Sequence, residues 1–71
     1  MLVSKKHDGT FDVEIKSYVS KQAECIELAL EHNGLCTNTF SRWYMPEIVL
    51  LTFNFETRSE ALSFCQNCKL V

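Results

Sequence analysis

The sequence predicts a small α+β domain with the element order ββαββα. Three observations support this: an Asp-Gly turn signal near the N-terminus, stretches of strand-like alternation, and two apolar-faced segments that begin with helix-capping residues. Two ββα units form a small, largely antiparallel sheet with both helices on one face. We expect a single domain over residues 1–71, because a chain of this length buries only about 60% of its surface, in one thin core.

The first hairpin is predicted from a turn signal between two strand-like segments. Residues 2–6 form a short strand, and Asp8-Gly9 favours a tight type I′ turn. From Phe11 onward apolar and polar side chains alternate, which is typical of a strand with one solvated face. If the first strand does not form, the remaining βαββα is a variant of the ferredoxin-like plait without its last strand. An edge strand remains in either case, and pairing of two copies would protect it.

The first helix is predicted over residues 21–32. Ser20 supplies a hydroxyl for the N-cap, and Gly34 suits the left-handed position that ends a helix. The spacing of its apolar residues gives a wide buried face, made of Ala23, Cys25, Ile26, Leu28, Ala29 and Leu30.

The second half of the chain predicts two further strands and a helix. Residues 35–45 form a strand, Pro46 interrupts it, and residues 47–56 form a strand that is apolar on both faces and therefore central. Thr57 and Glu60 are spaced as a capping box, which opens a helix over residues 58–68. Its inward side chains are expected to be Ala61, Phe64, Cys65 and Cys68.

Charge and composition exclude several function classes. The net charge of −2 and the isoelectric point near 5.6 argue against a general electrostatic grip on nucleic acid. No segment approaches the ~20 consecutive apolar residues of a membrane-spanning helix, and no secretory signal is visible. We therefore expect a complete, soluble, cytoplasmic protein.

Catalytic groups are sparse in this sequence. Its two histidines, His7 and His32, fall in a predicted turn and at a helix end, and no motif places either beside a cysteine. Phosphate-cradling loops need clustered glycines, whereas Gly9 and Gly34 stand alone. We expect neither an enzyme nor a cofactor.

The cysteines leave a metal site open as an alternative. Cys65 and Cys68 form a C-x₂-C pair, but on the inward side of the predicted last helix this spacing favours core packing. A zinc-stabilised interaction module would need two further ligands, for which the candidates are Cys25, Cys36, His7 and His32. We expect no metal ligands among these residues.

One segment shares a spacing with a nucleic-acid-binding strand. In residues 51–61 the spacing from Phe55 to Ala61 resembles that of RNA-recognition domains of the plait type. The glycines and stacking aromatics of such domains are missing from residues 49–52. A plait-type nucleic-acid-binding domain is therefore only an alternative function.

Two groups of residues predict a surface for a protein partner. Glu24, Glu27 and Glu31 share one face of the first helix, and Asp12 and Glu14 add negative charge on the outer face of a strand. Such a surface is either a solvated face or a docking surface for a basic protein.

The second group is Arg42, Trp43 and Tyr44, which are residue types enriched at interface hot spots. In a strand Trp43 and Tyr44 point to opposite faces, so Trp43 is either part of the core or an anchor for a partner or a second copy.

The function predicted from the sequence is that of a small non-enzymatic regulator or inhibitor that binds another protein. The partner would be basic, for example a nucleic-acid-binding protein, and the chain would be a phage-encoded factor acting on a host protein. This expectation reflects how often small cytosolic chains without catalytic groups are regulators.

Overall fold

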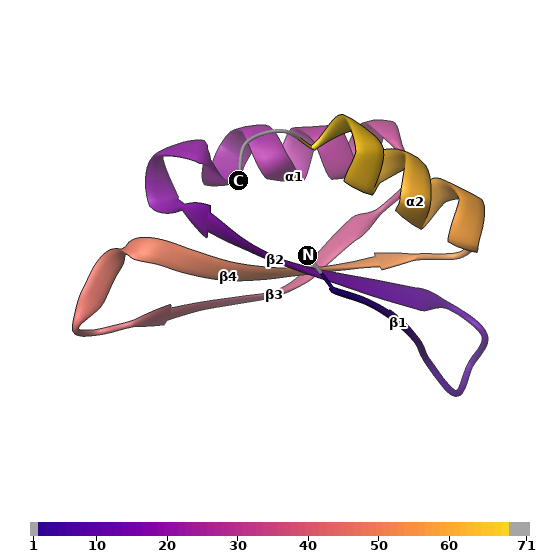
Figure 1. The fold of residues 1–71 in the computed structure, drawn as a ribbon, viewed down its shortest axis with the longest axis horizontal. Coiled ribbons are helices and arrows are strands. Elements are labelled where there is room, and N and C mark those ends of the chain that lie inside the picture. Colours follow the sequence, from indigo (N-terminus) through magenta and orange to yellow (C-terminus); the bar gives the residue numbers. More distant parts are fainter. Residues whose placement is uncertain (1, 69–71) are drawn as a thin grey trace.

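The computed structural model describes residues 2–68 and confirms the order ββαββα of an α+β fold. Both helices cover one face of the antiparallel sheet, and the other face, called the open face below, is covered by none of these described residues (Figure 1). The elements are β1 (Leu2–Lys5), β2 (Phe11–Tyr18), the short 3-10 turn η1 (Val19–Lys21), α1 (Gln22–Glu31), β3 (Leu35–Arg42), β4 (Met45–Phe55) and α2 (Arg58–Asn67).

The four strands lie in the order β1-β2-β4-β3, and each is antiparallel to its neighbours. β4 lies between β2 and β3, so β2, α1 and β3 form a split βαβ unit. The first strand does form, with Val3 opposite Val13. The sheet is thus not the three-stranded variant expected for a frayed first strand.

The core lies between the sheet and the helices. Phe64 of α2 is fully buried, and its ring centroid lies 5.1 Å from that of Phe53 and 5.3 Å from that of Phe55, both in β4. This aromatic cluster fixes α2 on the central strand. The other buried apolar side chains are Val13, Ile15, Cys25, Ala29, Val49, Leu51, Ala61 and Cys68.

The prediction of a type I′ turn in the first hairpin is wrong. A type I′ turn needs positive φ at two central residues, but in the β1–β2 loop only Gly9 has it, with φ of 88°. The Gly9 N–H donates to the Lys6 carbonyl at 3.2 Å, so a hydrogen-bonded turn is followed by a left-handed glycine. Asp8 stays at negative φ and accepts hydrogen bonds from the backbone and side chain of Thr10, at 3.0 and 2.6 Å.

The start of α1 also differs from the prediction. Ser20 lies inside η1, and α1 begins at Gln22 without a side-chain cap. Its buried face is narrower than expected, because Ala23 and Leu30 are exposed while Cys25 and Ala29 are buried.

The left-handed residue that ends α1 is Asn33, with φ of 64°, and not Gly34 as predicted. Gly34 has a different role, because a Cβ at this position would overlap the ring of Phe55. Its N–H donates to the Ala29 carbonyl at 2.7 Å, which holds the chain against the core as it enters β3.

The second hairpin turns earlier than predicted. β3 ends at Arg42 and β4 begins at Met45, so Pro46 lies inside β4 instead of separating the strands. Ser41 pairs with Val49 and Arg42 with Met45, which leaves residues 46–48 without partners on β3. A proline is tolerated in this bulge because its missing N–H is not needed for pairing.

The capping box and the inward face of α2 are confirmed. The Thr57 hydroxyl accepts the Glu60 backbone N–H at 3.2 Å and donates to its Oε1 at 3.0 Å, and Asn33 donates to Oε2 at 2.7 Å. Ala61, Phe64 and Cys68 are buried and Cys65 is partly buried, as predicted.

We predict that Gly34→Ala destabilises the fold by about 1–3 kcal/mol, because the new methyl group must displace the Phe55 ring. The free energy of unfolding would be measured by urea denaturation. The control is Gly9→Ala, which meets no atom within 4 Å and tests only the cost of positive φ, about 1–2 kcal/mol. A Gly34→Ala variant as stable as the native protein would contradict the packing described here.

The Glu60 carboxylate predicts a pH-dependent contribution to stability. Hydrogen bonds from Asn33 and then Thr57 lower the pKa of Glu60 in the folded state. The contribution is complete above the unfolded-state pKa, which is about 4.3 for glutamate, and is lost as the pH falls through the lower folded-state pKa. The unfolding free energies of the native protein and of Glu60→Gln should therefore differ at pH 7, and the difference should shrink as the pH falls below the unfolded-state pKa and through the folded-state pKa. A gap that is independent of pH would show that the carboxylate charge contributes nothing.

Candidate docking surface

The open face of the sheet carries an exposed apolar row. Along β4, Val49 and Leu51 point toward the helices, so Ile48 and Leu50 point the other way. Phe40 of β3 pairs with Leu50 and lies on the same face. Phe40 is 51% exposed and Leu50 38% exposed. An antiparallel sheet with helices on one side normally has polar residues on the other, so this row is unusual.

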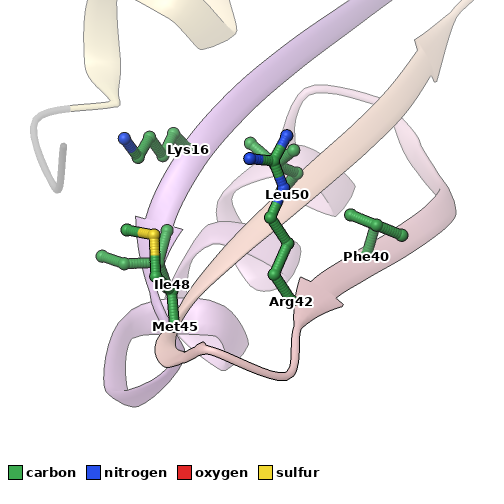
Figure 2. Close-up of a pocket in the computed structure, with 6 residues that line it drawn as sticks. All are labelled: Lys16, Phe40, Arg42, Met45, Ile48 and Leu50. Atoms are coloured by element: carbon green, nitrogen blue, oxygen red, sulfur yellow. The ribbon is translucent and has the colours of Figure 1, made fainter.

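The apolar row forms the floor of a shallow hollow of about 110 Å³ beside the β3–β4 hairpin. Figure 2 shows Lys16 on β2 at one side and the Arg42 side chain extending toward Leu50. The bulge in β4 places Met45 and Ile48 at the hairpin end of the hollow. The full lining is Lys16, Phe40, Arg42, Met45, Ile48 and Leu50.

Two cations flank this apolar floor. Neither Lys16 nor Arg42 belongs to an ion pair within residues 2–68. The ion pair found among these residues joins Lys21 and Glu24, with 3.7 Å between nitrogen and oxygen. The Arg42 Nη1 also donates to the hydroxyl of Tyr44, a residue of the β3–β4 turn, at 3.0 Å. The hollow is therefore apolar at its base and positively charged at its rim.

Trp43 and Tyr44 form the tip of the hairpin. They are turn residues, so the prediction that they alternate across a strand is wrong. Trp43 is 90% exposed and is therefore not part of the core. Its ring packs edge-on against Tyr44 at a centroid distance of 5.5 Å, and the Arg42 guanidinium carbon lies 6.0 Å from the centre of the Tyr44 ring. These predicted residues are brought together, beside the hollow.

The predicted acidic residues are not brought together. Glu24, Glu27 and Glu31 are exposed on α1, which covers one face of the sheet. Asp12 and Glu14 alternate with the buried side chains of β2 and therefore lie on the open face. Asp12 also accepts a hydrogen bond from the Asn54 side chain at 2.9 Å. The sheet thus separates the acidic residues into two surfaces.

The sequence prediction did not include Lys16, Phe40, Met45, Ile48 or Leu50 as site residues. A signal for them existed, because residues 47–56 are apolar on both faces while both helices are expected on one face. Together these two expectations leave one apolar row of the central strand uncovered.

The burial and hydrogen-bond partners of two cysteines and of His32 are those of structural residues. Cys25 is buried beside the Ser17 hydroxyl, with 3.7 Å between sulfur and oxygen, and burial raises the pKa of the Cys25 and Cys65 thiols. The His32 ring nitrogens lie 3.0 Å from the Leu28 carbonyl and 3.2 Å from the Asn67 amide. In the part of the chain that the structure describes, no three His, Cys, Asp or Glu side chains are placed to hold a metal ion, and no helix is long and apolar enough to cross a membrane.

We predict that Trp43 contributes little to stability and is open to solvent. Trp43→Ser should change the free energy of unfolding by less than about 0.5 kcal/mol, whereas Phe64→Ala in the core should cost about 3–5 kcal/mol. Trp43 is the only tryptophan in the chain, so its fluorescence reports this site alone. Iodide should quench it nearly as strongly in the folded protein as in urea, and protection of the folded state would contradict an exposed hairpin tip.

Comparisons with known proteins do not assign the chain to a family. No model of a protein family, no curated protein and no solved structure matches the chain.

Proposed function

We propose that this chain is a non-enzymatic protein-binding module. Its contact surface is the hairpin patch, defined as the lining of the hollow together with the tip residues Trp43 and Tyr44. The observation that carries the proposal is the exposed apolar row of the open sheet face, together with a nearly fully exposed tryptophan at the tip of the hairpin that borders it. Leaving this much apolar surface in water is unfavourable, and such patches mark sites of association.

The composition of the hairpin patch supports protein binding in particular. Aromatic residues, methionine and arginine are the residue types enriched in the cores of protein interfaces, and all of them occur here. Tyr44 already contacts both Trp43 and Arg42, so little side-chain freedom is lost when a partner binds.

A binding protein without catalytic groups acts by occupying its partner's surface. We therefore propose a regulatory or inhibitory role in the cytoplasm, of the kind that phage-encoded factors exert on host proteins. This finer assignment extends the proposal of protein binding and does not alter the site.

The acidic face of α1 is the second candidate surface. Glu27 and Glu31 are exposed, and among the described residues neither forms an ion pair, whereas Glu24 is paired with Lys21. A basic partner would bind this face, and such binding would weaken steeply with salt. The two hollows found among the described residues are lined by β2, β3 and β4 and by no residue of α1, so the hairpin patch is the stronger candidate.

We predict that the hairpin patch, and not α1, is needed for binding. The folded chain would be used as bait in a lysate with and without nuclease treatment, beside two variants that retain its circular dichroism spectrum. The combined change Trp43→Ser and Leu50→Gln should reduce capture of a partner at least tenfold, because hot-spot residues contribute about 2 kcal/mol or more. Charge reversal of Glu24, Glu27 and Glu31 to lysine should leave capture intact.

Three outcomes would contradict this prediction. Loss of capture only in the charge-reversed variant would move the site to α1, and equal capture by all three proteins would exclude both surfaces. A captured species that disappears on nuclease treatment would instead favour nucleic-acid binding.

A further inference from the structure

We infer that the segment bound by the hairpin patch is acidic and inserts one apolar side chain into the hollow between Lys16 and Arg42. This inference rests on the proposed function and names the chemistry of the partner at the same site. Three properties of the patch lead to it: the size of the hollow, the charge at its rim, and the poor fit of a second copy.

The hollow has room for one side chain. Its volume of about 110 Å³ is below the roughly 150 Å³ of a cavity that holds benzene, and well below the ~300–1,000 Å³ of small-molecule pockets. It is open to solvent along the sheet, and Phe40, Ile48 and Leu50 provide an apolar floor. A leucine-sized side chain that projects from a larger molecule fits this space.

The rim of the hollow selects negative charge. Lys16 on β2 and Arg42 on β3 are separated by β4, and strands that lie two apart are about 10 Å from one another. Neither cation is neutralised by an ion pair within residues 2–68. A segment whose apolar residue enters the hollow places its flanking residues near these cations. Carboxylates at the flanking positions would form charge-assisted hydrogen bonds with them, whereas lysines would be repelled.

A second copy of the chain does not fit the patch symmetrically. The open face carries Asp12 and Glu14 at one end and the cations Lys16 and Arg42 at the other. A two-fold axis that brings the acidic end of one copy onto the cations of the other therefore places Phe40 and Leu50 over the polar end of the second copy. An axis that pairs the apolar rows brings like cations together instead. Neither of these two arrangements satisfies both requirements, which favours a different protein as the occupant.

The test uses blocked peptides and the ¹⁵N-labelled full chain. The probe is the acetylated, amidated peptide Glu-Glu-Leu-Glu-Glu, titrated at low salt and followed by amide chemical shifts. The controls are Gln-Gln-Leu-Gln-Gln, which lacks the charge, and Glu-Glu-Ser-Glu-Glu, which lacks the apolar anchor. We expect shifts centred on Lys16, Phe40 and Leu50. Binding of the uncharged peptide should be roughly three- to tenfold weaker, as expected for two exposed ion pairs.

A matched pair of variants separates the site from general electrostatics. Lys16→Gln combined with Arg42→Gln should abolish the preference for the glutamate peptide over the glutamine peptide. Lys5→Gln combined with Lys6→Gln changes the net charge equally at the far end of the sheet, and should preserve that preference.

The inference is overturned by shifts outside the hairpin patch, by equal affinity for the charged and uncharged peptides, or by the same loss in both variants. Patch shifts that change on dilution without peptide would assign the site to a second copy, including a head-to-tail contact with the acidic face of α1. If the peptides do not bind as expected but the Trp43→Ser and Leu50→Gln changes still reduce partner capture, the hairpin patch remains the binding site and only the inference of an acidic partner segment is wrong. If both experiments fail, the proposed function is wrong as well.

Discussion

The contact between Phe64, Phe53 and Phe55 is the interaction on which the rest of the structure depends. It fixes α2 on β4, and the Phe55 ring also occupies the space that Gly34 leaves at the entry to β3. One aromatic cluster therefore positions the last helix, the central strand and the connection from α1. Because a domain of this size has no second core, the loss of this packing affects all of these elements together.

The same packing decides which side chains of β4 lie on the open face. Once Val49 and Leu51 are turned toward the helices, the pleat of β4 turns Ile48 and Leu50 outward. Both helices lie on one side, so nothing in residues 2–68 covers this second row. The candidate site thus arises because β4 is apolar on both faces while the helices cover only one face of the sheet.

The sequence predicted the elements well, because alternation and capping are local signals. The last helix is an example, since the bonds between Thr57 and Glu60 depend on neighbouring residues alone. Errors arose where tertiary contacts decided between local options. Pro46 reads as a breaker in isolation but is accommodated by a bulge, and this shift carries Trp43 out of the strand and into the turn. The partly predicted site reflects the same limit, because Lys16, Phe40 and Leu50 meet only through strand pairing.

The bulge at residues 46–48 separates the tip of the second hairpin from the regular ladder between β3 and β4. Substitutions and small changes in loop length at Trp43 and Tyr44 need not propagate to Val49 and Leu51, which secure β4 in the core. Evolution can therefore retarget this protein by altering the tip while the scaffold is conserved. In this fold the residues that stabilise β4 in the core are therefore different from the tip residues that can change which partner is bound.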